Sequence, residues 1–260
     1  MAIPVFQVDA FTNRVFGGNP AAICPLDEWL PDATLQAIAA EHNLSETAYL
    51  RRSSPGVYDL RWFTPAVEVD LCGHATLASA LVVFDHLEPW LNEVGFDTRS
   101  GRLLVRRADG RLLMDFPSRK PVPCEEPVFL IEGLGLRPQQ VLKASDYVAV
   151  YATEEEVRSL EPDMRLLKEL PSRGVIVTAP GREVDFVSRF FAPQSGIDED
   201  PVTGSAHSTL IPYWSERLQK SQLHALQVSR RQGELWCADR GERVEISGQA
   251  VLYSRGTILI

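Results

Sequence analysis

The sequence is poor in the features that mark disulfide-stapled, membrane-spanning or nucleic-acid-binding proteins. Only 4 of its 260 residues are cysteines, without the Cys-x-x-Cys or Cys/His spacing of a structural zinc site. No apolar run comes near the roughly 20 residues that a membrane helix needs. Acidic residues outnumber basic ones by 35 to 26, and a net charge of −9 argues against nucleic-acid binding. We therefore expect a cytoplasmic protein with free thiols and neither a membrane nor a nucleic acid as partner.

Loops that mark common cofactor-dependent and hydrolytic enzymes are also missing. The chain contains no Gly-x-Gly-x-x-Gly and no Gly-x-x-x-x-Gly-Lys segment, the loops that hold dinucleotides and ATP. The segment Thr203-Gly204-Ser205-Ala206-His207 lacks the last glycine of a serine hydrolase elbow. The N-terminus shows no basic stretch followed by an apolar one, so we expect no secretory signal. These absences favour a reaction that uses no cofactor.

What is present indicates a globular α+β fold. Hydrophobic residues make up 45% of the chain and charged residues 23%, which is usual for globular proteins. Residues 6–10 alternate like a half-buried strand, and Gly17-Gly18-Asn19-Pro20 predicts a tight loop. Asp32 is expected to cap a helix that ends near Asn43. Two hairpins are predicted, over 46–52 with 57–63 and over 103–107 with 112–116.

The strongest organisational signal is an internal repeat. Trp62-Phe63-Thr64-Pro65 is followed by an acidic loop and by Gly73-His74-Ala75-Thr76, which opens an apolar helix. Phe190-Phe191-Ala192-Pro193 is likewise followed by an acidic loop and by Gly204-Ser205-Ala206-His207, which opens a second helix. The same order of parts predicts two pseudo-equivalent domains, each with a mostly apolar central helix.

We place the domain boundary in the segment 117–127, where four prolines make a stiff connector. The first domain is then 1–118 and the second is 119–256.

Small residues at the two helix starts predict paired anion sites. The first turn of a helix presents unpaired N–H groups and a partial positive charge, which suits a carboxylate or phosphate. Gly73 and Gly204 would supply such groups in one shared cleft. The alternative is that both glycines only allow close packing at a helix start.

Three titratable residues are candidates for chemistry, each with a plainer alternative. His74, in the first helical turn, suits a neutral imidazole that donates a hydrogen bond or moves a proton, or is a structural histidine. Glu46, where a helix gives way to a strand, suits a general acid/base, or is a solvated surface group. Asp200, before Pro201, either caps the helix near Gly204 or is a second catalytic acid.

Five motifs together resemble the phenazine biosynthesis PhzF-like family, and they occur in the family's order across nearly the whole chain. They are Phe16-Gly17-Gly18-Asn19-Pro20-Ala21-Ala22, Leu44-Ser45-Glu46-Thr47-Ala48, Phe63-Thr64-Pro65-Ala66-Val67-Glu68, Cys72-Gly73-His74-Ala75-Thr76 and Asp200-Pro201-Val202-Thr203-Gly204-Ser205-Ala206.

The resemblance implies a diaminopimelate-epimerase-like fold, with two similar domains that each wrap a β-sheet around a central helix. It implies an active site in the cleft between them, and a final strand, 257–260, that returns to the first domain. It also implies a homodimeric isomerase of a small carboxylated metabolite that uses neither cofactor nor metal.

By the same resemblance, Glu46 looks like the residue that takes a proton from one carbon and returns it to another. His74 and Asp200 look like its catalytic partners. Substrate-binding residues are carried over at Asn19, Gly73, Gly204 and Ser205.

Two other functions stay open. One is a non-catalytic binding or interaction protein on the same fold. The other is a racemase or epimerase that uses Cys72, although the second cysteine of such enzymes is missing from the stretch Asp200-Pro201-Val202.

Overall fold

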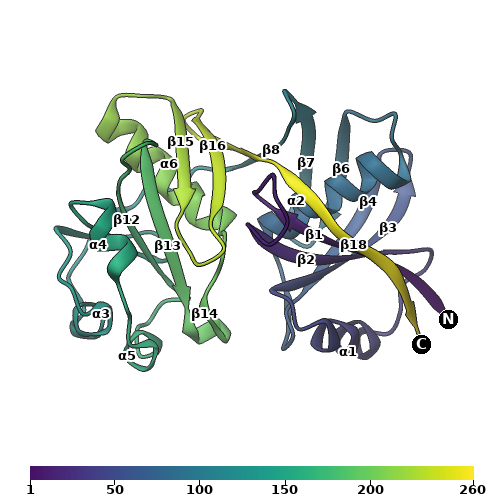
Figure 1. The fold of residues 1–260 in the computed structure, drawn as a ribbon, viewed down its shortest axis with the longest axis horizontal. Helices are drawn as coiled ribbons and strands as arrows, with labels where there is room; N and C mark the ends of the chain where they lie inside the picture. The colour runs from purple at the N-terminus through teal and green to yellow at the C-terminus, as the bar shows by residue number, and fades with distance from the viewer. The chain divides into compact units, whose positions relative to one another are not determined.

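The computed structural model describes all 260 residues and divides them into two compact units. The first unit comprises Met1–Asp115 and Ser247–Ile260, and the second comprises Phe116–Ile246. The chain thus returns to the first unit at Ser247, earlier than the expected 257–260. The reason is the length of the last strand, which pairs with the first strand along its whole course (Figure 1).

The first unit is a sheet around one short helix. Its elements are β1 (Ala2–Ala10), β2 (Asn19–Leu26), α1 (Asp32–His42), β3 (Glu46–Ser54), β4 (Val57–Phe63), β5 (Glu68–Val69), α2 (Gly73–Val82) with a π-turn (Val83–Leu87), β6 (Glu93–Thr98), β7 (Gly101–Ala108), β18 (Ala250–Leu259) and β8 (Arg111–Pro117), whose last two residues belong to the second unit. β1 lies between β2 and β18, antiparallel to both. The pairs β2–β3 and β4–β6 are parallel, and α1 and α2 respectively make these connections.

Helix α2 is the core of this unit. Eight of its ten residues are buried, because it is apolar on every side and contacts β1, β2, β3 and β18. Its start, including His74, is therefore held in the interior rather than at the surface.

The second unit has the same kind of core. Its elements are β9 (Val122–Pro123), α3 (Val128–Leu134), β10 (Gln140–Lys143), β11 (Tyr147–Val150), α4 (Glu154–Ser159), α5 (Met164–Lys168), β12 (Val175–Pro180), β13 (Phe186–Ala192), a 3₁₀ turn (Pro193–Ser195), β14 (Ile197–Glu199), α6 (Gly204–Leu218), β15 (Gln222–Gln227), β16 (Gly233–Asp239) and β17 (Arg243–Gly248), whose last two residues belong to the first unit. Helix α6 packs on β15 and β16, and no helix of the chain is long and apolar enough to cross a membrane.

The strand pairings confirm the predicted repeat. In both units a parallel pair leads into an antiparallel strand, a short strand, the central helix and a second parallel pair. Phe63 lies opposite Thr47 and Glu68, and Phe191 lies opposite Val175 and Glu199. The two units are thus aligned residue by residue along β4 and β13.

An ion pair repeats with the strands. Nε and Nη2 of Arg61 donate to the two carboxylate oxygens of Glu68, and Arg189 binds Glu199 in the same bidentate way. Each guanidinium also lies over the phenylalanine two residues on, Phe63 at 5.1 Å and Phe191 at 4.9 Å. The repeat therefore extends from backbone order to side-chain contacts.

Some of the local predictions are confirmed and one is wrong. The α1 helix ends at Asn43 in the left-handed conformation, and both hairpins form as predicted. The prediction that Asp32 caps α1 is wrong, because Asp32 is already helical and Pro31 is the cap residue. The segment 117–127 belongs to the second unit, where β9 pairs with β10.

Candidate active site

Three side chains of the first unit meet where two parallel strands begin. Asn19 is the first residue of β2, Glu46 is the first residue of β3, and His74 is the second residue of α2. Glu46 lies opposite Ala21 in the β2–β3 ladder, so the two strand starts share one edge. Gly73, the first residue of α2, brings the helix start to the same place.

The imidazole of His74 lies between the other two side chains. Its Nε2 is 3.0 Å from Oε2 of Glu46, and its Nδ1 is 3.1 Å from the amide nitrogen of Asn19. Nε2 carries a proton toward Glu46 both in the neutral tautomer that accepts at Nδ1 and in the protonated ring. The three side chains are buried, with exposed fractions of 0% for Asn19, 4% for His74 and 9% for Glu46.

The contact between His74 and Glu46 is close but not aligned as a hydrogen bond. Neither Nε2 of His74 nor Oε2 of Glu46 has a hydrogen-bond partner in the protein, although both atoms are buried. Buried polar atoms are nearly always satisfied, and those that are not commonly mark functional positions. The two atoms face each other at 3.0 Å and have no further partner in the protein.

The charge of His74 depends on opposing effects. Burial lowers its pKa, whereas Cys72 and the carboxylate of Glu46 raise it, and the pKa of His74 lies well above its usual value. The expectation of a neutral imidazole considered only the helix dipole, and the neighbouring carboxylate acts in the opposite direction.

Cys72 completes this cluster as the residue before α2. Its Sγ is 3.5 Å from Nδ1 of His74, and burial raises the pKa of its thiol to about 11. Glu46, Cys72 and His74 form the one group in the chain whose donor atoms, all within 4.8 Å of one another, could hold a metal ion. A metal ion would have to displace the thiol proton first, because thiolate is the ligating form.

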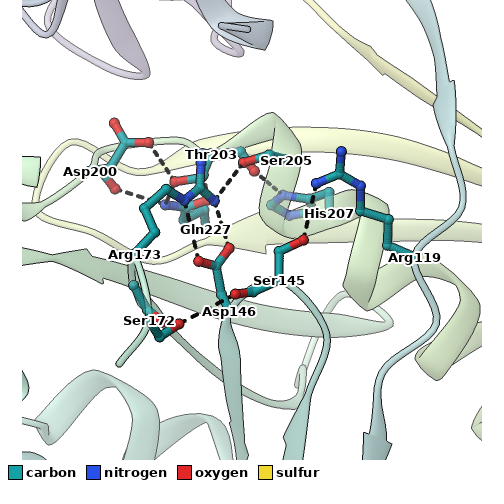
Figure 2. A network of polar contacts seen from close by, with 11 residues as sticks. Arg119, Ser145, Asp146, Ser172, Arg173, Asp200, Thr203, Ser205, His207 and Gln227 are labelled. Atoms are coloured by element: carbon teal, nitrogen blue, oxygen red, sulfur yellow. Dashed lines mark hydrogen bonds and ion pairs between the residues drawn. The ribbon is translucent and has the colours of Figure 1, made fainter. Parts of the chain in front are cut away.

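In the second unit, Asp200 lies in a loop that a buried glutamine holds. Oδ2 of Asp200 accepts a hydrogen bond from the hydroxyl of Thr203 at 2.5 Å. The side chain of Gln227 bonds both the Thr203 backbone amide and the Asp200 carbonyl at 2.8 Å (Figure 2). The cap residue of α6 is Thr203, whose side chain makes no capping hydrogen bond and is bonded to Asp200 instead.

Ser205 occupies the position of His74 in the repeat, as the second residue of a helix that Gly204 begins. Its Oγ accepts a hydrogen bond of 3.1 Å from Nη2 of Arg173, which also binds Asp146 (Figure 2). Sequence reasoning missed both Arg173 and Asp146, because neither lies in a motif.

His207, the fourth residue of α6, has a structural partner. Its Nδ1 lies 2.9 Å from the Thr203 carbonyl, and burial lowers its pKa to about 4. Thr76, its counterpart in α2, donates its hydroxyl to the Cys72 carbonyl at 2.6 Å. The fourth residue of each central helix therefore bonds the residue before that helix.

The candidate residues thus form two groups, one in each unit. Asn19, Glu46, Gly73 and His74 lie together in the first unit. The second unit brings together Asp200, Gly204 and Ser205 at the start of α6.

Known proteins resemble this chain over its full length. Residues 8–256 match the family described as phenazine biosynthesis-like protein. Two uncharacterized isomerases of Pseudomonas aeruginosa are 55% and 53% identical to the chain, with 99% of each sequence covered. A phenazine biosynthesis-like domain-containing protein from Homo sapiens is 39% identical, again over 99% of both chains.

Solved structures give the same result for the fold. A crystal structure of a PhzF family protein from Enterococcus faecalis superposes with a TM-score of 0.97, at 44% identity and full coverage of both chains. A hydroxyproline epimerase from Agrobacterium vitis shares the fold at 10% identity, with a TM-score of 0.59, 99% of this chain and 92% of that one. The chain has the predicted diaminopimelate-epimerase-like fold, and it is an isomerase that belongs to the phenazine biosynthesis-like family.

Proposed function

We propose that this protein moves a proton between two carbons of a small carboxylated metabolite, without a cofactor, and that Glu46 is the general acid/base. The observation that carries the proposal is the buried contact of Glu46 Oε2 with His74 Nε2 at 3.0 Å, in which neither atom has a hydrogen bond. A buried carboxylate paired with an imidazole in this way suits a general acid/base.

In the proposed reaction, the Glu46 carboxylate removes a proton from a carbon near the substrate carboxylate. The electron pair left on that carbon shifts into an adjacent double bond, and Glu46 returns the proton to the far carbon of that system. No electron acceptor is needed, because substrate and product differ only in where one proton and one double bond lie. His74 stabilises the Glu46 carboxylate, and its raised pKa is consistent with that role.

Charge that develops on the substrate needs nearby donors. The first N–H groups of α2, at Gly73 and His74, have no acceptor within their own helix. We propose that they stabilise the negative charge of the intermediate. Asn19, Gly204 and Ser205 are proposed to bind substrate, and Asp200 to assist the proton transfer.

Proton exchange in D₂O, followed by NMR, tests this proposal. A panel of small carboxylates, including a dihydro-anthranilate and several amino acids, is incubated with wild type, Glu46→Gln and Glu41→Gln. Glu46→Gln keeps the shape of the side chain but cannot titrate, so we expect exchange to fall by about 10³-fold. Glu41→Gln removes an exposed carboxylate of α1 and is expected to exchange as wild type does.

Two results would contradict the proposal. Exchange within a few-fold of wild type in Glu46→Gln would exclude Glu46 as the acid/base. Binding without exchange across the whole panel would contradict the proposed proton transfer on small carboxylates. A racemase that uses Cys72 would instead lose exchange in Cys72→Ser. The thiol pKa of about 11 argues against such a racemase, because little thiolate is present near neutral pH.

A further inference from the structure

Arg173 presents a fixed guanidinium at the surface of the second unit. Its Nε and Nη2 bind the two carboxylate oxygens of Asp146 at 3.2 and 2.6 Å, and Nη2 also binds Ser205 (Figure 2). The ring of Phe190 lies under the guanidinium at 5.2 Å. The Arg173 side chain is 48% exposed, whereas that of Asp146 is 3% exposed. A buried carboxylate therefore holds one edge of an accessible cation.

This cluster occupies the same place in its unit as the Glu46 cluster does in the first. When Phe63 is aligned with Phe191 in the repeat, Glu46 corresponds to Gly174. Arg173 therefore lies one residue before the position that corresponds to Glu46. Each strand start thus brings a charged group to the second residue of the central helix. The distances are 3.0 Å from Glu46 to His74 and 3.1 Å from Arg173 to Ser205.

Two donors of the cluster have no acceptor in the protein. Nη1 of Arg173 makes no hydrogen bond, since only Nε and Nη2 contact Asp146 and Ser205. The Ser205 hydroxyl accepts from Arg173 and makes no other hydrogen bond, so its proton is free to be donated. One guanidinium nitrogen and one neighbouring hydroxyl match the two oxygens of a carboxylate.

The charge of the cluster disfavours a dianion. Asp146 offsets the charge of Arg173, so the pair has no net charge with which to compensate a dianion such as phosphate. A monoanion is held by the two free donors, one of them on the guanidinium. Because Asp146 already fixes the guanidinium, little side-chain entropy is lost when a ligand binds.

We propose that Arg173 and Ser205 bind the carboxylate group of the substrate and that Asp146 is the residue that positions Arg173. That the ligand is the substrate's carboxylate rests on the proposed function, whereas the arrangement of the two donors is independent of it.

The first test measures binding to the full chain, labelled with ¹⁵N and ²H, by NMR at constant ionic strength. Benzoate is the monoanionic probe, benzamide its neutral analogue of the same shape, and inorganic phosphate the dianionic probe. We expect benzoate to shift the amide signals of Gly204 and Ser205 and the Nε–H signal of Arg173 saturably. Benzamide and phosphate should bind at least about tenfold more weakly, the loss expected for one charge-assisted hydrogen bond.

Variants of the cluster identify the residue responsible. Arg173→Gln should weaken benzoate binding by about tenfold or more. Arg173→Lys should recover part of that loss, because it keeps the charge without the fork. Asp146→Asn should weaken binding less than Arg173→Gln does, since the guanidinium remains but is no longer fixed. Arg119→Gln is the control, because this exposed side chain bonds only Ser145 Oγ, at 3.2 Å.

The outcomes separate this proposal from the proposed function. Saturable benzoate binding that depends on Arg173 supports the carboxylate site even if no compound of the panel exchanges protons. A rise in KM with little change in kcat for Arg173→Gln also supports it. Benzoate binding that is absent, that matches benzamide or phosphate, or that is unchanged in Arg173→Gln overturns the site, whatever Glu46→Gln shows.

Discussion

The two units share one backbone plan but differ in the environment of the matching polar clusters. In the first unit, His74 and Glu46 are buried, and their contact leaves two polar atoms without hydrogen bonds. In the second unit, Arg173 and Ser205 are accessible, and their contact is an aligned hydrogen bond. A buried, unsatisfied carboxylate suits proton transfer, whereas an exposed, fixed guanidinium suits binding. Duplication of a fold therefore does not duplicate its chemistry, because burial and charge decide what each copy can do.

The largest difference in stability that we expect between the two units is a pH effect of opposite sign at their buried histidines, His74 and His207. The pKa of His207 is lowered to about 4 in the folded protein, so the unfolded chain, with its pKa near 6.5, binds the proton first. Stability should therefore fall by about 3 kcal/mol as the pH drops from about 6.5 to about 4. The raised pKa of His74 acts the other way, because its contribution is complete below pH 6.5 and is lost as the pH rises through the folded pKa.

Urea unfolding between pH 4.5 and 8 measures both effects. His207→Asn retains a donor for the Thr203 carbonyl but does not titrate, so the loss at acid pH should shrink in this variant. His74→Gln should reduce the loss of stability that wild type shows as the pH rises. Identical acid slopes in wild type and His207→Asn would show that His207 is not kept neutral by its burial.

A smaller effect is expected at the repeated arginines. Arg189 binds Glu199 and also donates to the carbonyls of Val157 and Leu160 at 3.1 and 2.8 Å. Arg61 binds Glu68 and the exposed Asp32. Arg189→Met leaves more buried groups without a partner, so we expect a loss of about 2 kcal/mol, against about 1 kcal/mol for Arg61→Met. Urea midpoints at low and high salt check this order, and equal losses would mean that the two carbonyl bonds add nothing.

Much of the first cluster could be predicted from the sequence. Glu46, His74 and Asn19 each lie in a motif at the start of an element, and strand starts in a parallel pair share one edge. The repeat was visible because aromatic strand ends and glycine helix starts recur in order. Its residue-level match, such as Glu68 with Glu199, required the strand register.

The second cluster could not be predicted in the same way. Asp146 and Arg173 come from separate loops, and each resembles a solvated surface charge in the sequence. Their contact depends on the parallel pairing of β11 with β12, which brings residues far apart in the chain to one edge. The buried Gln227 that holds Asp200 is hidden for the same reason, since its partners lie in a distant loop.

The smallest effect concerns two buried tryptophans, which again differ in hydrogen bonding. Trp62 and Trp214 are 1% and 0% exposed, but only Trp214 donates its Nε1–H, to Thr178 Oγ1 at 2.9 Å. Both tryptophan-to-phenylalanine variants lose ring volume, and Trp214→Phe also loses this bond, so it should cost about 1 kcal/mol more than Trp62→Phe. A double-mutant cycle with Thr178→Val should give a coupling of about 1 kcal/mol for Trp214 and close to zero for Trp62. Equal coupling would mean that the bond to Thr178 contributes nothing, and that burial alone sets the stability of both indoles.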